Sequence, residues 1–234
     1  MIESWIDLAR GPLFRISLGI LVLGLAYRFG VVLVQVVAAW RRAGDRRLPT
    51  GAVAAATLGW LLPKRLLRAR PLYSVASFSF HVGIILVPLF LVGHVALLRG
   101  YLPRDWPRLD PLLADVLTLV CVVALGSLLI GRTMSPTARA LSKTQDVAIV
   151  AMLLLLVLSG FFASHPMLSP LGARTMLLVH MLVGNLALVL TPMTKIVHCV
   201  LYPLTQLVFE LGWHFPAETG EHVAVALNKE GEPV

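Results

Sequence analysis

Long apolar runs, separated by short polar and basic stretches, dominate the pattern along this chain. A helix that crosses the apolar core of a bilayer needs about 20 mostly apolar residues. Five runs reach this length, at roughly 14–39, 74–98, 111–131, 146–163 and 174–199. The pattern therefore predicts an all-α integral membrane protein in which five transmembrane helices form one bundle.

A further apolar stretch, 51–62, would extend only about 18 Å as a helix, and it ends at Pro63 before a basic run. We expect it to lie at the membrane interface. After the fifth run the tail keeps an apolar face to about residue 214 and then becomes polar. The sequence thus predicts a membrane domain over 1–214 and a polar, mobile cytoplasmic tail over 215–234.

Composition agrees with a lipid environment. Of the 234 residues, 58% are hydrophobic and only 14% are charged, whereas about a quarter of a soluble protein is charged. The net charge of +8 comes from basic residues that flank the apolar runs, which indicates topology and attraction to anionic lipid. The lipid bilayer is therefore an expected partner, and nucleic acid is not.

Basic residues are concentrated in the first and third loops, which places these loops in the cytoplasm, the N-terminus outside and the C-terminus inside. They are Arg41, Arg42, Arg46, Arg47, Lys64, Arg65, Arg68 and Arg70 in the first loop, and Arg132, Arg139 and Lys143 in the third. Trp5 and Trp106 are expected at the outer interface. Cys121 and Cys199 form no CxxC or CxxCH motif, and we expect both to be small buried residues.

Four of the seven histidines fall in two predicted helices, His81 and His94 in the second and His180 and His198 in the fifth. Ionisable residues inside a membrane are rare and suggest function, although a single buried histidine is more often only hydrogen-bonded. The spacings correspond to about 20 and 27 Å along a helix. Because the two helices run antiparallel, His81 should lie level with His198 near the inner end, and His94 level with His180 near the outer end.

Histidine pairs on facing helices are typical of bis-histidine haem sites, and the absence of CxxCH favours b-type haem. Gly83, Gly93 and Gly184 lie close to the histidines and would let a flat macrocycle approach, or they serve ordinary helix packing. On an ideal helix His81 and His94 are roughly 140° apart in phase. Pro88 can kink the helix between them, so both one and two haems stay open.

Three segments carry a resemblance to a known family: FHVGIILVPLFLVGH at 80–94, MSPTARALSKTQDVAIV at 134–150 and VHMLVGNLALVLTPMTKIVH at 179–198. The chain resembles the cytochrome b subunits typified by the gamma subunit of respiratory nitrate reductase. It is also similar to their relatives in sulfite-reduction and heterodisulfide-reductase-like membrane complexes. The resemblance covers all five helices, roughly 14–200.

The resemblance implies two b haems, ligated by His81, His94, His180 and His198, and a menaquinol or ubiquinol site at Gly93 beside the outer haem. It implies electron transfer to an iron–sulfur subunit and a separate terminal catalytic subunit, at a bacterial cytoplasmic (inner) membrane. The histidine spacing in the second helix is longer than in the nitrate reductase type, and the early lysine of its third helix is absent. Both departures favour a relative with another catalytic partner.

Other polar residues carry weaker hypotheses. Arg28 could neutralise a haem propionate or extend to the interface. Arg132 and Lys195 could serve propionates or a partner subunit, or they only set topology. Asp115 could accept a quinol proton, and Asp146 suits a helix start. His165 is expected in the outer loop, and His214 and His222 are expected to be solvated. The alternative function is a haem-free membrane anchor or a small transporter, the latter favouring helices broken within the membrane. No terminal catalytic site is expected, so whether the chain is an enzyme stays uncertain.

Overall fold

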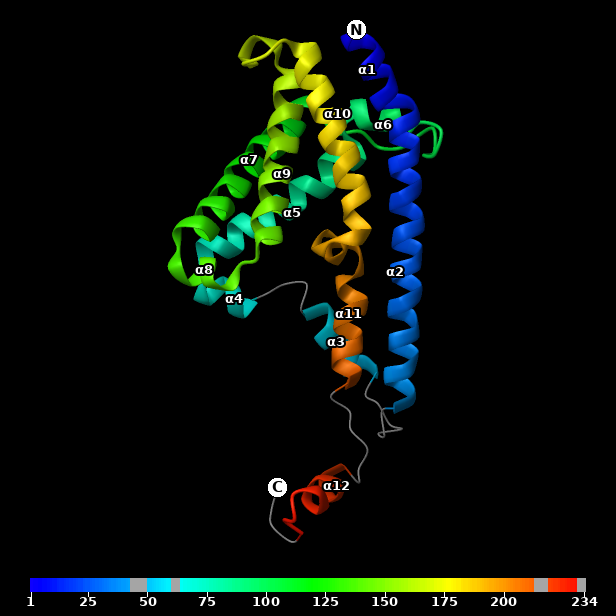
Figure 1. Cartoon of the computed structure of the whole chain (residues 1–234), viewed down its shortest axis with the longest axis vertical. Helices are drawn as coiled ribbons and strands as arrows, with labels where there is room; N and C mark the ends of the chain where they lie inside the picture. Colours follow the sequence, from blue (N-terminus) through cyan, green and yellow to red (C-terminus); the bar gives the residue numbers. More distant parts are fainter. Residues whose placement is uncertain (43–49, 60–63, 213–218, 231–234) are drawn as a thin grey trace. The chain divides into compact units, whose positions relative to one another are not determined.

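The computed structural model describes residues 1–42, 50–59, 64–212 and 219–230. Over these ranges the regular structure is entirely helical (Figure 1). Five helices are long and apolar enough to cross a membrane: Ile2–Arg41, Pro71–Phe90, Pro111–Met134, Thr144–Ser164 and Ala173–Met193. The prediction of an all-α protein with five membrane spans is confirmed. Arg46, Arg47, Pro63 and His214 lie outside the described residues.

The chain divides into two compact units. The first unit combines Met1–Leu21 with Lys64–Thr191, and the second combines Val22–Pro63 with Pro192–Val234. Each unit is described by itself below. Whether all five spans form a single bundle, as the sequence suggests, therefore stays a prediction.

Four spans make up most of the first unit and pack in chain order (Figure 1). Helix α7 (Pro111–Met134) packs against α5 (Pro71–Phe90), α9 (Thr144–Ser164) against α7, and α10 (Ala173–Leu190) against α9. Their connections are short, and successive helices run antiparallel. The ends of α5 and α9 and the starts of α7 and α10 thus share one end of the unit. We name it the α6 end, after the short helix α6 (Val92–Leu97) that follows α5.

The core of the first unit lies where α5, α7 and α9 meet. Its buried side chains are Phe80, Cys121, Ala124, Leu125, Leu128, Val150, Leu153 and Val157. A Cβ added at Gly83 would lie 2.2 Å from the Sγ of Cys121 and 3.1 Å from the carbonyl oxygen of Leu117. Gly83 therefore serves close packing of α5 on α7, which is one of the two roles its position in the sequence allowed.

Short polar contacts fix the ends of the spans. The carboxylate of Asp110 caps α7 by accepting from the backbone N–H groups of Leu112 and Leu113. At the opposite end, Arg132 at the close of α7 donates to the carbonyl oxygen of Asp146 at 3.1 Å, in the first turn of α9. The six-residue helix α8 (Pro136–Leu141) connects α7 and α9. Another six-residue helix, α4 (Lys64–Ala69), precedes α5.

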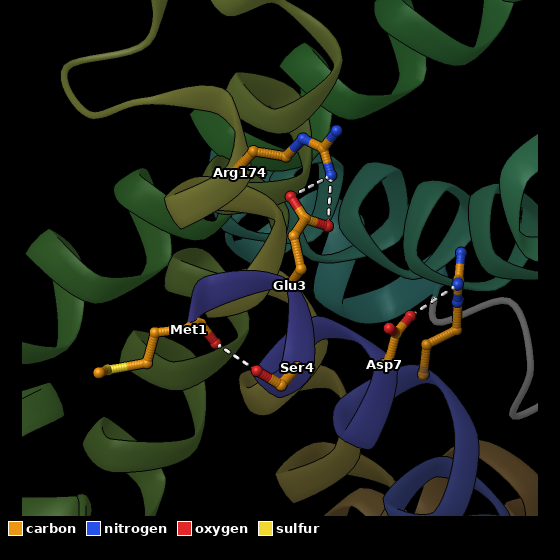
Figure 2. A network of polar contacts seen from close by, with 6 residues as sticks. Met1, Glu3, Ser4, Asp7 and Arg174 are labelled. Carbon is orange, nitrogen blue, oxygen red and sulfur yellow. Dashed lines mark hydrogen bonds and ion pairs between the residues drawn. The ribbon is translucent and has the colours of Figure 1, made fainter.

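The first span begins earlier than the sequence pattern predicted. Helix α1 (Ile2–Leu8) runs through a π-helical turn, η1 (Ala9–Leu13), into α2 (Phe14–Arg42). Figure 2 shows the Glu3 carboxylate of α1 facing Arg174 at the start of α10. The distance from Nη1 of Arg174 to Oε1 of Glu3 is 2.5 Å. At the first residue of the π-helical turn, the carbonyl oxygen of Ala9 accepts a hydrogen bond from the buried amide of Asn185 at 3.0 Å.

The second unit contains the rest of α2, α3 (Thr50–Gly59), α11 (His198–Gly212) and α12 (Thr219–Ala226). Helix α3 packs against α11, and Val53, Thr57, Leu201 and Leu211 are buried. The short helix α3 coincides with the apolar stretch predicted at the interface. Helix α12 lies within the predicted polar tail, where the pattern indicated no helix.

The predicted fifth helix is interrupted. Helix α10 ends at Leu190, followed by two short 3₁₀ turns, η3 (Thr191–Met193) and η4 (Lys195–Val197). Thr194 between them is extended, with φ −123° and ψ −176°. Pro192 lacks a backbone N–H and disfavours continuation of the α-helical ladder. The expectation that His180 and His198 lie on one straight helix is therefore wrong, because His198 begins α11.

Candidate functional site

The second predicted helix is also interrupted, and the break positions His94. Helix α5 ends at Phe90, Leu91 is extended (φ −64°, ψ 132°), and α6 follows. Two carbonyl groups freed by the break find new donors: Leu89 accepts from the indole of Trp106, and Phe90 from the backbone N–H of Leu109, both at 2.9 Å. Since His81 and His94 lie on different helices, the 140° phase difference of an ideal helix does not apply.

The structure brings His94 and His180 together. Their Nε2 atoms are 3.5 Å apart, and their ring planes are inclined by 21° with centroids 5.8 Å apart. The Nδ1 of His180 lies 2.9 Å from the carbonyl oxygen of Leu156, and the Nδ1 of His94 lies 3.4 Å from that of Val87. Both histidines belong to the first unit. This predicted pair is thus observed at the α6 end.

These contacts determine which nitrogens are available. A carbonyl oxygen only accepts, so each Nδ1 carries the proton and each Nε2 presents a lone pair. Two lone pairs that face one another at 3.5 Å repel unless a proton or a metal ion lies between them. Metal–imidazole bonds are about 2 Å long, so a metal ion bound in line holds the two nitrogens about 4 Å apart. The spacing of His94 and His180 is therefore close to that of two imidazole ligands of one metal ion.

Gly160 of α9 lies against the ring of His180. A Cβ added at Gly160 would be 2.8 Å from Cε1 and 2.9 Å from Nδ1 of that imidazole. Gly160 lies on α9, which carries neither histidine of the pair, so the histidine spacing gave no signal for it. It follows Leu156, whose carbonyl oxygen contacts His180, by four residues. At Gly93, in contrast, a Cβ would meet nothing within 4 Å, so the backbone next to His94 is open.

The other predicted pair stays a prediction, because His81 belongs to the first unit and His198 to the second. His81 is half-buried near the middle of α5, not near its end as expected, and its Nδ1 is 2.6 Å from the carbonyl oxygen of Ser77. His198 is exposed, and its Nδ1 contacts the carbonyl oxygen of Lys195. Cys199 is exposed too, so the expectation that it is buried is wrong, whereas Cys121 is buried as predicted.

Arg28 lies in the part of α2 that belongs to the second unit. Its Nε donates to the carbonyl oxygen of Pro192 at 3.0 Å. One turn earlier, Gly24 packs on the same residue, since an added Cβ would lie 2.6 Å from two ring carbons of Pro192. Arg28 thus satisfies a carbonyl group at the break after α10, and its role toward a haem propionate stays a prediction.

Two polar contacts were not foreseen. His165, which follows the last residue of α9, is half-buried, with its Nε2 3.3 Å from the Oδ2 of Asp115. Asn185 is buried, with 6% of its surface exposed, and its Nδ2 donates to Ala9 and Met181. Histidine and asparagine in or next to apolar runs were the available signals. His222 is exposed, as expected.

Five apolar spans, with a histidine pair formed by α6 and α10, define a multi-pass helical membrane protein with a candidate metal-binding site. A protein of Nitratidesulfovibrio vulgaris (strain Hildenborough) is 34% identical over 172 residues, which is 73% of this chain and 74% of that protein. The chain belongs to the family of this protein. No family model matches the chain, and no solved structure matches it. The name of the relative states no activity, so the function is argued from the site.

Proposed function

We propose that this chain is the membrane cytochrome b subunit of a quinol-linked oxidoreductase, which carries two b haems and passes electrons between the quinone pool and an iron–sulfur partner. The observation that carries the proposal is the approach of Nε2 of His94 to Nε2 of His180 at 3.5 Å, with each Nδ1 directed to a backbone carbonyl. The three sequence segments that resemble the gamma subunit family of respiratory nitrate reductase support it.

His94 and His180 would hold one haem, and His81 and His198 the second. A b haem bound by two imidazoles supplies one-electron transfer. The protein would contribute the ligands and orient His180 through the carbonyl of Leu156. Partners of metal-bound histidines of this kind fix the tautomer and the ring orientation.

The basic loops support an orientation with the N-terminus outside and the α6 end at the outer face of a bacterial cytoplasmic membrane. In this orientation quinol binds beside the outer histidine pair, next to Gly93, where the backbone is open. The iron–sulfur subunit docks on the inner side, where Arg68, Arg132 and Arg139 supply positive charge. The terminal catalytic subunit lies elsewhere in the complex.

The helix breaks give the alternative of a small transporter some weight, because broken helices are typical of transporter binding sites. In such sites the freed carbonyl groups line an ion or substrate site. Here the carbonyl groups of Leu89 and Phe90 are bonded to Trp106 and Leu109 instead. The break after α5 therefore positions His94, and the carbonyl groups of Leu89 and Phe90 are not left to bind an ion or substrate.

The test is a dithionite-reduced minus oxidised visible spectrum of the purified protein, with a pyridine haemochrome count per polypeptide. We expect a b-type spectrum and two haems. The variants His94→Ala and His180→Ala should each lose one haem, whereas His222→Ala, which alters an exposed histidine, should keep both. Protein that contains no haem, although it was made with ample haem supply, would overturn the proposal in favour of a haem-free anchor.

A further inference from the structure

A carboxylate and an imidazole meet at the α6 end of the first unit. Asp115 lies in the second turn of α7, inside the span Pro111–Met134, and its Oδ2 is 3.3 Å from Nε2 of His165. The exposed fractions of the two side chains are 42% and 31%. An ionisable residue within a membrane span is rare and suggests function when a partner is close. The orientation of the chain in the membrane explains neither the position of Asp115 within the span nor its contact with His165.

The contacts of His165 determine which nitrogen can exchange a proton. Its Nδ1 donates to the carbonyl oxygen of Phe161 at 3.0 Å, and its ring stacks on that of Phe161 with centroids 4.3 Å apart. Nδ1 is thus occupied, and the exchangeable proton lies at Nε2, facing Asp115. Nε2 and Oδ2 are close enough to share a proton, and the carboxylate has a second oxygen that can accept one.

Helix α9 connects this pair to the histidine site. Leu156 and Gly160 contact the imidazole of His180, and His165 follows Gly160 by five residues. Five residues of helix correspond to about 7.5 Å along the axis. The direction is toward the end of the span at Ser164. The Asp115–His165 pair therefore lies between the level of the histidine site and the membrane surface.

Two other charged groups near this end are engaged elsewhere. The carboxylate of Asp110 caps α7, and Arg174 pairs with Glu3. Arg174 leads α10, the helix that packs against α9. The carboxylate nearest to His165 is thus Asp115, through a direct contact.

We infer that Asp115 and His165 form the proton-accepting pair for quinol oxidation at the His94–His180 site; this rests on the proposed function. When quinol is oxidised, a haem held by His94 and His180 would accept one electron for each O–H bond that breaks, and the proton would pass to the carboxylate of Asp115. Nε2 of His165, 3.3 Å from that carboxylate, would take the proton on toward water. Two such events convert the quinol into quinone, with two electrons and two protons released.

The test compares two reductants of the purified, haem-loaded protein by stopped-flow spectroscopy. Decylubiquinol and menadiol deliver electrons together with protons, whereas dithionite delivers electrons alone. Asp115→Asn keeps an oxygen that can accept from His165 but removes the proton-accepting carboxylate. His165→Gln is the second variant. Asp110→Asn is the matched control, because it alters a carboxylate on the same helix that does not pair with His165.

We expect Asp115→Asn to slow haem reduction by quinol about 100-fold, the usual scale for a lost proton acceptor. The haem content, the spectrum and the rate of reduction by dithionite should match those of the wild type. Haem reduction by quinol in Asp115→Asn should show an increased solvent isotope effect, and Asp115→Glu should restore much of the quinol rate. A wild-type quinol rate in Asp115→Asn and His165→Gln, or equal slowing with both reductants, would overturn the inference. If quinol does not reduce haem in the wild-type protein, the proposed function itself fails, and the wild-type measurement alone reveals it.

Discussion

Gly160 packs against the imidazole of His180, where a Cβ added to the glycine would lie 2.8 Å from Cε1 and 2.9 Å from Nδ1. The same helix supplies the carbonyl of Leu156, which fixes the ring through Nδ1 at 2.9 Å. One turn of α9 therefore both orients His180 and sets how closely α9 approaches α10. Neither contact involves a residue of the resemblance motif at 179–198 other than His180 itself.

Gly160→Ala tests this relationship. A methyl group 2.8 Å from Cε1 and 2.9 Å from Nδ1 must displace the ring, which lengthens the bond to Leu156 and turns Nε2 away from His94. Loss of a group that orients a metal ligand weakens metal binding about 10- to 100-fold. We expect the purified variant to lose the haem of the His94–His180 site, measured by haemochrome count. Gly126→Ala, where an added Cβ meets nothing within 4 Å, should keep the wild-type count; equal counts in both variants would contradict the assignment.

Gly83→Ala should destabilise the contact between α5 and α7. The added Cβ would lie 2.2 Å from the Sγ of Cys121 and 3.1 Å from the carbonyl oxygen of Leu117, and overpacking of this kind costs about 1–3 kcal/mol. We expect a lower free energy of unfolding in detergent. The double variant Gly83→Ala/Cys121→Ala should recover part of the loss, because it removes the closer contact. No recovery would indicate that the backbone of Leu117 sets the limit.

The number of spans could be predicted from the sequence, because about 20 consecutive apolar residues are a strong physical signal. The breaks at Leu91 and Thr194 could not, because the histidine-bearing segments read as continuous helices and a proline permits a break without fixing its position. The pairing of His94 with His180 was predicted from antiparallel order. That prediction assumed straight helices, whereas the observed approach of the two imidazoles depends on the turn at Leu91.

Contacts made by helices that carry no histidine of the predicted sites could not be predicted from the sequence pattern. Gly160 and the Asp115–His165 pair come from helices α7 and α9, which carry no histidine of the predicted sites. A single glycine or aspartate in an apolar run has many possible neighbours. Only packing determines which neighbour it meets, so these contacts required the structure.

Trp106→Phe tests the break that positions His94. The indole Nε1 donates to the carbonyl oxygen of Leu89 at 2.9 Å, and the ring stacks on Phe90 with centroids 5.9 Å apart. Phenylalanine keeps the stacking but removes the donor, which should cost about 1 kcal/mol of unfolding free energy. We expect Trp106→Phe to be less thermally stable but to keep its haem. Trp106→Ala should be less stable still and should also lose haem. Trp5→Phe, at a half-exposed tryptophan, serves as the control, and an equal effect in it would show that the loss is not specific to the break.

Asn185 fixes the π-helical turn of the first span against α10. Its Nδ2 donates to the carbonyl oxygens of Ala9 and Met181, at 3.0 and 2.9 Å, in a site where only 6% of its surface is exposed. Asn185→Leu removes both bonds and should lower the free energy of unfolding by about 1 kcal/mol, the scale of interhelical hydrogen bonds in membranes. Asn185→Asp should be worse, because a carboxylate cannot donate and would face two carbonyl oxygens. Asn228→Asp, at an exposed asparagine with φ 54°, makes the same chemical change and should be neutral. Thermal unfolding in detergent would rank the three variants; an Asn185→Asp protein as stable as the wild type would mean that the amide does not donate to Ala9 and Met181.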